Sequence, residues 1–261
     1  MASPDLRSLI EAARNVPLSA DIPARTVPLI DLTSLKGGES PAEIEALCAR
    51  AVEHGTAAVC IYAEAVPIAR PLLAGSPVRV ATVANFPHGG DDITGTADET
   101  AAAVAAGADE VDIVAPVAAL LDGDVGLVGE LVEACRAAVG PDITLKLILE
   151  TGRLQESDLI TAAARAAVMA GIDFLKTSTG KIETGATLEA AAALLTVCRE
   201  ADGRVGFKAA GGIRTARDAA GYLRLADAIM GPDWVSPHTF RFGASSLLDE
   251  LLGRGGVSAG Y

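Results

Sequence analysis

The chain has 261 residues, half of them hydrophobic, which is enough for one large α/β barrel or two small domains. Its net charge of −13 argues against nucleic acid or an anionic membrane as a partner. No signal peptide and no membrane-spanning apolar run are evident, so we expect a cytoplasmic protein. The four cysteines and three histidines are dispersed, so we expect buried free thiols and neither disulfides nor a metal site.

The first predicted element is a helix, because Ser3-Pro4 is typical of an N-cap followed by a first-turn proline. It should run to about Asn15 and precede the first strand. Short apolar runs then predict eight strands: Val27–Leu32, Ala58–Tyr62, Val78–Ala84, Glu110–Val114, Thr144–Leu149, Phe174–Thr177, Val205–Ala209 and Phe240–Gly243. Alanine-rich segments between them predict helices: Pro41–His54, Thr96–Ala106, Val125–Val139, Glu156–Ala170, Thr187–Ala201 and Thr215–Ala226.

Apolar strands that alternate with helices favour a parallel sheet covered by helices. Eight such units in about 250 residues predict a (β/α)8 TIM barrel with an extra N-terminal helix. A doubly wound open sheet is the alternative, but no GxGxxG follows the first strand. We expect one barrel domain over 1–261, ending in a flexible glycine-rich tail at 253–261.

Two lysines stand at matching places on two late strands. Lys176 and Lys208 each follow a hydrophobic pair and precede a loop of small residues. A lysine is nucleophilic only when it is neutral, and a neighbouring cation helps to deprotonate it. Two ammonium groups about 4 Å apart repel by roughly 4 kcal/mol at an effective dielectric near 20. If the two lysines lie close together, one of them could therefore be neutral and form a Schiff base with a carbonyl group.

Three further strands carry ionisable residues, Asp31, Asp112 and Lys146. Inward side chains of a filled barrel are normally apolar. A structural ion-pair cluster is one interpretation, but buried pairs are weak evidence for stability, because desolvation offsets their attraction. Perturbed groups gather at functional sites, so we favour a catalytic network.

The loops after the last three strands are rich in small residues, which is typical of phosphate sites in such barrels. The candidate phosphate-binding residues on these loops are Gly180, Lys181, Gly211, Gly212, Ser245 and Ser246.

Six segments resemble the deoxyribose-phosphate aldolase family, a family of class I aldolases. They are Leu29–Thr33, Ala84–Gly89, Asp109–Asp112, Lys146–Gly152, Phe174–Gly180 and Phe207–Arg214. The likeness extends from about Val27 to the C-terminus, with compatible order and spacing.

The resemblance implies reversible cleavage of 2-deoxy-D-ribose 5-phosphate to D-glyceraldehyde 3-phosphate and acetaldehyde, with no cofactor and no metal. It assigns the Schiff base to Lys176, the lowering of its pKa to Lys208 and proton shuttling to Asp112. Asp31 would hold Lys208, and Lys146 would lie beside Asp112. The partners would be phosphosugar and aldehyde substrates. Whether the chain forms a homodimer is a question that the sequence leaves open.

The family also ends on a tyrosine that is thought to assist proton transfer to an enamine carbon. Residues 253–260 could let Tyr261 reach the barrel mouth, since eight such residues span roughly 15 Å as a random coil. A loose terminal residue is the alternative.

Two other functions remain open from the residues alone. A phosphosugar isomerase needs a base but no imine, and a sugar-phosphate-binding protein would have no reason to bury two lysines and Asp112. Borohydride reduction separates all three, because only an imine is trapped.

Overall fold

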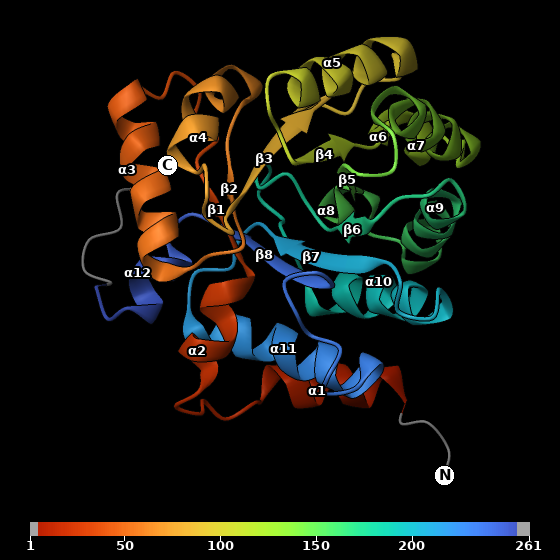
Figure 1. The fold of residues 1–261 in the computed structure, drawn as a ribbon. Coiled ribbons are helices and arrows are strands. Elements are labelled where there is room, and N and C mark those ends of the chain that lie inside the picture. The colour runs from red at the N-terminus through yellow and green to blue at the C-terminus, as the bar shows by residue number, and fades with distance from the viewer. Residues whose placement is uncertain (1–4, 255–261) are drawn as a thin grey trace.

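The computed structural model describes residues 5–254, and in this range eight parallel strands close into a barrel (Figure 1). The barrel closes because β1 pairs with β8 as well as with β2. The strands are β1 (Ile30–Thr33), β2 (Ala58–Cys60), β3 (Arg79–Ala84), β4 (Glu110–Val114), β5 (Thr144–Ile148), β6 (Phe174–Lys176), β7 (Gly206–Ala210) and β8 (Phe240–Ala244).

Helices cover the outside of the barrel, so the predicted (β/α)8 fold is confirmed (Figure 1). The longer helices are α1 (Leu6–Arg14), α3 (Pro41–His54), α5 (Ile93–Ala105), α7 (Gly126–Val139), α9 (Ser157–Met169), α10 (Leu188–Glu200) and α11 (Ala216–Met230). The shorter ones are α2 (Ile22–Thr26), α4 (Val66–Leu72), α6 (Val117–Leu121), α8 (Thr151–Leu154) and α12 (Leu247–Leu251). Within 5–254, no helix combines the length and apolar character that crossing a membrane requires.

Local sequence explains where α3 begins and ends. The Ser40 hydroxyl accepts from the Glu43 backbone N–H, and the Glu43 carboxylate accepts from the Ser40 N–H, which together form a capping box. Pro41 occupies the first turn, where its missing N–H costs nothing. Gly55 ends the helix at φ 68°, a left-handed conformation that glycine adopts without strain.

The structure shifts most of the predicted boundaries by one to four residues and adds helices that the pattern missed, α2 among them. The first strand begins at Ile30 and not at Val27, because Val27–Leu29 form a 3-10 turn that contains Pro28. Helix α4 was not predicted, because its two prolines, Pro67 and Pro71, are typical of loops. Helices α6, α8 and α12, of four or five residues each, were missed as well.

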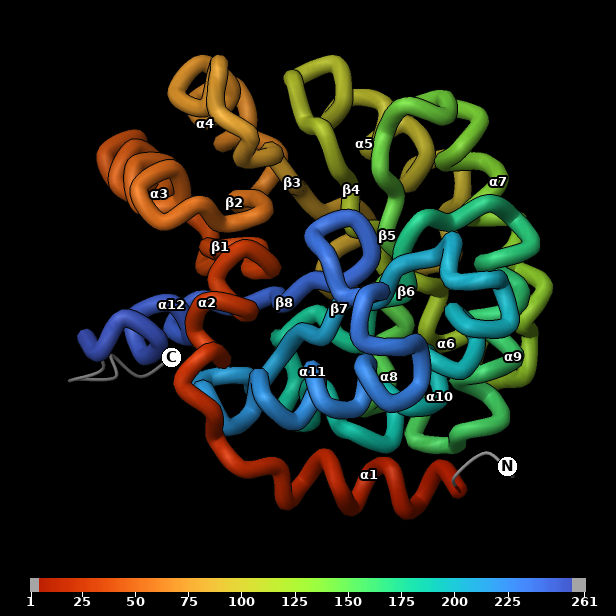
Figure 2. The backbone as a smooth tube through the Cα atoms, turned by 60° about the horizontal axis from the view of Figure 1, so that its bottom comes forward, coloured from red at the N-terminus to blue at the C-terminus, as the bar shows by residue number. Residues whose placement is uncertain are grey.

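The extra N-terminal helix is present as α1, which packs against α10 and α11 (Figure 2). Helix α1 begins at Leu6 with Asp5 as its N-cap, so it starts later than the expected cap at Ser3-Pro4. Those two residues and most of the expected tail, including Tyr261, lie outside the described residues.

The inside of the barrel has two unlike halves. Strands β2 and β3, with Leu35 from the loop after β1, supply apolar side chains, which we call the apolar wall: Leu35, Ala58, Cys60, Ala81 and Val83. The remaining strands send charged side chains inward, and these meet across the barrel. Arg241 of β8, for example, contacts Glu110 of β4.

Candidate active site

Lys176 and Lys208 lie side by side inside the barrel. Lys176 is the last residue of β6, and its Cα partner in the parallel register is Lys208 of β7. Both ammonium groups donate to the same carboxylate oxygen, Oδ2 of Asp112 on β4, at 2.7 Å each. Lys208 is fully buried, whereas Lys176 keeps 3% of its surface exposed.

Six charged side chains form a closed cycle of contacts inside the barrel, with cations and anions in alternation. We call it the ionic ring: Arg241, Asp31, Lys208, Asp112, Lys146 and Glu110.

Each carboxylate of the ionic ring bridges two cations. Asp112 accepts from Lys208 through Oδ2 at 2.7 Å and from Lys146 through Oδ1 at 2.8 Å. Glu110 accepts from Lys146 at 2.6 Å, and its other oxygen accepts from Arg241 at 2.9 Å. Asp31 joins Arg241 at 2.6 Å to Lys208 at 2.5 Å. Three positive charges therefore balance three negative ones.

Lys176 is attached to the ionic ring but is not a member of it. It forms an ion pair with Asp112 Oδ2, the oxygen that Lys208 also uses. Burial lowers the pKa of Lys176, and repulsion from Lys208 lowers it further, while the Asp112 carboxylate works in the opposite direction. Desolvation is thus the larger cause, ahead of the second cation on which the sequence argument relied.

The cations of the ionic ring behave in the opposite way. Burial would lower the pKa of Lys208, but the carboxylates of Asp112 and Asp31 outweigh it and raise that pKa. Lys146 has a raised pKa for the same reason, with Asp112 and Glu110 as its partners. Lys146 and Lys208 therefore hold their protons. Lys176 differs from them, because its burial favours the neutral amine.

The carboxylates of the ionic ring are held ionised. Burial would raise the pKa of Asp112, yet the ammonium groups of Lys146, Lys176 and Lys208 hold it well below its usual value. The pKa values of Asp31 and Glu110 are also lowered, because ring cations outweigh the effect of burial at both.

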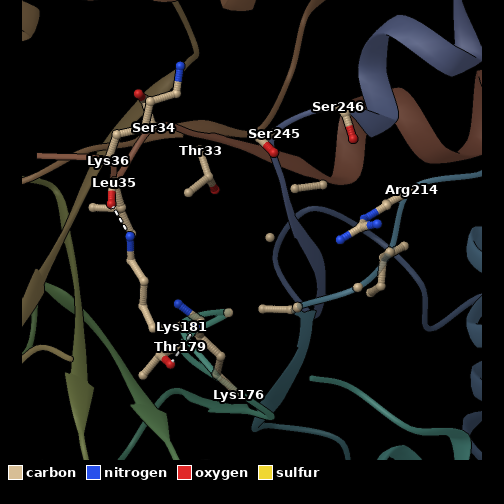
Figure 3. Close-up of a pocket in the computed structure, with 17 residues that line it drawn as sticks. Thr33, Ser34, Leu35, Lys36, Lys176, Thr179, Lys181, Arg214, Ser245 and Ser246 are labelled. Carbon is tan, nitrogen blue, oxygen red and sulfur yellow. Dashed lines mark hydrogen bonds between the residues drawn. The ribbon is translucent and has the colours of Figure 1, made fainter. Parts of the chain in front are cut away.

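A cavity of about 240 Å³ opens above Lys176 at the carboxyl ends of the strands (Figure 3). Its other lining residues come mainly from the loops after β1, β6, β7 and β8. The charged residues among those that line it are Lys36, Lys176, Lys181 and Arg214, with no carboxylate within 5–254. The guanidinium of Arg214 points into the cavity (Figure 3). A locally positive site therefore exists on a chain of net charge −13.

Close contact between two loops shapes one side of the cavity. Gly211 has φ 88°, and a Cβ there would lie 3.0 Å from the Cα of Gly185, so a side chain would force the loops after β6 and β7 apart. Gly243 of β8 is similarly constrained, because a Cβ would lie 3.1 Å from Cε of Lys208.

The loop after β6 is held by a buried carboxylate, Glu150. Its oxygens accept from the Thr179 hydroxyl at 2.5 Å and from the Thr179 N–H at 3.3 Å. The Thr179 hydroxyl in turn accepts from the Lys181 N–H at 3.0 Å, and the Lys181 ammonium donates to the carbonyl of Leu35 (Figure 3). Lys181 therefore reaches across the cavity to the loop after β1.

The structure brings together the expected Lys176, Lys208, Asp112, Asp31 and Lys146 in one network. It also places all six expected phosphate-binding residues at one cavity: Gly180, Lys181, Gly211, Gly212, Ser245 and Ser246. Tyr261 lies outside the described residues.

Sequence reasoning missed several charged residues of the site. Glu110 stands two residues before Asp112 on the same strand, so strand alternation could have placed both inside the barrel. Arg241 stands between two phenylalanines in an apolar strand, which is also an ionisable group in a buried run. Lys36, Glu150 and Arg214 are loop residues for which no comparable signal exists.

Comparison with known proteins identifies the family of the chain. Residues 27–253 match the model of the DeoC/LacD family aldolases. A candidate deoxyribose-phosphate aldolase from Coccidioides immitis shares 29% identity at a TM-score of 0.79, and the match covers 97% of this chain and 98% of that one. A protein named QR15, an aldolase, shares 31% identity at a TM-score of 0.71, over 87% and 95% of the two chains. A candidate deoxyribose-phosphate aldolase from Toxoplasma gondii ME49 shares 26% identity at a TM-score of 0.80, over 89% and 93%.

The barrel and the family match together define a lyase of the aldolase class. The chain belongs to the DeoC/LacD family of aldolases, since the match extends over most of its length.

Proposed function

We propose that this aldolase reversibly cleaves 2-deoxy-D-ribose 5-phosphate to D-glyceraldehyde 3-phosphate and acetaldehyde through a Schiff base on Lys176. The observation that carries the proposal is the position of Lys176. Its amine lies where a buried ionic network meets a cavity lined by cations, and burial and Lys208 both lower its pKa. Similarity to candidate deoxyribose-phosphate aldolases supports the choice of substrate.

The first half of the reaction forms the electron sink. Neutral Lys176 attacks the aldehyde carbon C1 of the open-chain sugar and gives a carbinolamine. Loss of water and uptake of one proton from the site leave a protonated imine, which accepts the electrons of the C–C bond. Partial access to the cavity suits Lys176 to this role, whereas Lys208 is fully buried and ion-paired to two carboxylates.

The second half breaks the bond between C2 and C3. A base removes the proton of the C3 hydroxyl, the C2–C3 electrons move into the iminium, and glyceraldehyde 3-phosphate departs. The enamine that remains is protonated at carbon, and hydrolysis releases acetaldehyde and the free amine. Asp112, Lys208 and ordered water are the groups that we assign to these proton transfers.

Asp112 is suited to proton transfer because its basicity depends on Lys176. Three ammonium groups hold its pKa well below the usual value in the resting site. Once Lys176 is neutral, one of those cations is lost and Asp112 becomes the better base.

The substrate phosphate would bind between the loops after β6, β7 and β8. Gly180, Gly211, Gly212, Ser245 and Ser246 line this part of the cavity, and we assign their backbone N–H and hydroxyl groups as donors to the phosphate. Lys181 and Arg214 supply positive charge beside this space. Their attraction for the phosphate outweighs the repulsion from the net negative charge of the chain, because salt screens that longer-range repulsion.

Covalent trapping tests this function. Treatment with acetaldehyde and borohydride should add a two-carbon group to Lys176, located by mass spectrometry of the modified peptide. An adduct on Lys208 alone contradicts the assignment of the Schiff base to Lys176, and the absence of any adduct leaves an isomerase or a binding protein. Activity should also survive a chelator, and its loss would indicate a different aldolase chemistry.

A further inference from the structure

The ionic ring is closed by two residues that lie away from the cavity. Like the other four ring members, Arg241 and Glu110 are not among the residues that line it, and both are at least 95% buried. They contact each other at 2.9 Å and 3.2 Å, across the barrel between β8 and β4. Each then contacts a different further partner, Asp31 for Arg241 and Lys146 for Glu110.

The charges of this network do not balance when Lys176 is protonated. The ionic ring has three cations and three anions, so the Lys176 ammonium adds one positive charge that no member of the ring balances. An unbalanced charge in a low-dielectric interior is costly, and loss of one proton removes it.

We propose that Arg241 and Glu110 are positioning residues that set the proton affinity of Lys176 through the charge balance of the ionic ring, without touching the substrate. The inference rests on the proposed imine chemistry for its meaning, because that chemistry needs a neutral Lys176. The ring itself, its contacts and its charge count stand independently of the substrate.

The titratable groups that face Lys176 come from several strands. Asp112 is on β4, Lys208 on β7 and Cys60 on β2, and Glu150 follows β5. Two of them belong to the ionic ring, so a change in ring charge reaches Lys176 through groups that already contact it. Burial raises the pKa of the Cys60 thiol, so that group adds no charge near neutral pH.

The two ring-closing residues should act in opposite directions when neutralised. Arg241→Met removes a cation and leaves the cluster balanced only when Lys176 is protonated, so Lys176 should stay charged to higher pH. Glu110→Gln removes an anion and adds a second excess positive charge, so Lys176 should become neutral at lower pH. Each shift should be about one pH unit or more.

Two further variants separate charge from shape. Arg241→Lys keeps the charge while it loses the forked contact with Glu110. The midpoint, which is the pH at which half of Lys176 is deprotonated, should therefore stay unchanged. The double variant Arg241→Met with Glu110→Gln loses both contacts but restores the charge count, so the midpoint should return to that of the unaltered protein. A purely structural role predicts no such return.

The readout is chemical labelling of Lys176 as a function of pH. Formaldehyde with cyanoborohydride methylates neutral lysine amines, and mass spectrometry compares the Lys176 peptide with exposed Lys36 as an internal reference. This reaction needs no aldolase activity. Acetaldehyde trapping of the same proteins tests the proposed function separately, so either idea can fail while the other survives.

Opposite shifts in the two single variants and a restored midpoint in the double variant support the proposal. Shifts in the same direction, or unmoved midpoints in folded protein, overturn it. If circular dichroism shows that Arg241→Met does not fold, Glu110→Gln and Arg241→Lys decide the matter. The proposal then requires a lowered midpoint in Glu110→Gln and an unchanged midpoint in Arg241→Lys.

Discussion

The two halves of the barrel interior use opposite physical means around one amine. The apolar wall on β2 and β3 offers no ion pair and removes water, which favours neutral Lys176. The ionic ring on the other strands fixes six charges in mutual contact, and Lys176 shares one of its carboxylate oxygens. The reactive amine of Lys176 therefore lies at the boundary of the two halves, and neither half alone would make it reactive.

Members of the ionic ring should contribute mainly to the stability of the fold, whereas Lys176 should contribute mainly to reactivity. Removal of a ring member leaves a buried opposite charge short of a partner, which typically costs about 3–5 kcal/mol. Removal of Lys176 leaves the ionic ring complete. The two lysines, although adjacent in register, should therefore respond differently to the same substitution.

The largest effect on activity is expected for Lys176→Met. Loss of the imine should lower kcat by about 10⁴-fold or more, because the chemistry loses its electron sink. Thermal unfolding should change less than for Lys208→Met, which breaks contacts with Asp31 and Asp112. Equal destabilisation by the two substitutions would contradict the distinction between ring member and attached residue.

The next effect concerns Tyr261, which lies outside the described residues. As a phenol it can donate a proton near pH 7, and we propose that it enters the site to protonate the enamine carbon. Tyr261→Phe should slow solvent-deuterium exchange into acetaldehyde by about 10²-fold. Trapping at Lys176 and folding should be nearly unaffected, and an equal exchange rate would remove Tyr261 from the mechanism.

A smaller effect is expected from the ionic half through Lys208→Leu. Loss of this cation raises the pKa of Lys176, since one repulsion disappears and Asp112 becomes more available to pair with the ammonium. Because the amine must be neutral to react, the midpoint of borohydride trapping should move to higher pH by about 1–2 units. An unchanged profile would mean that burial alone activates Lys176.

The smallest shift should come from the apolar half through Cys60→Asp. A carboxylate beside Lys176 favours its protonated form, so the trapping midpoint should rise by about one pH unit or less. Cys60→Ser is the matched control, because it adds no charge, and its midpoint should stay in place. A folded Cys60→Asp protein with an unmoved midpoint would show that the apolar wall does not influence the amine.

Much of this arrangement could be predicted from the sequence, because the relevant signals are local. Continuous apolar strands that alternate with alanine-rich helices determine the barrel, and the matching positions of Lys176 and Lys208 follow from strand register. The family match supports the class of chemistry. The first strand was placed three residues early, because Pro28 in an apolar run does not by itself distinguish a strand from a 3-10 turn.

Closure of the ionic ring could not be predicted, because it depends on contact between strands on opposite sides of the barrel. Glu110 and Arg241 are 131 positions apart in the chain, and no spacing rule links them. The same holds for the contact between Lys181 and Leu35, which joins loops 146 positions apart. Such contacts arise only when the sheet closes.

The paired charges of the ionic ring have a consequence for proton counting. Its acids have lowered pKa values and its bases raised ones, so all six groups keep their charge through the neutral range. A cluster of seven buried ionisable side chains should then exchange about one proton with solvent, at Lys176. In the resting site, six charges are therefore fixed and Lys176 is the group that titrates, so calorimetry in buffers of different ionisation enthalpy should register uptake of about one proton when neutral Lys176 forms the protonated imine.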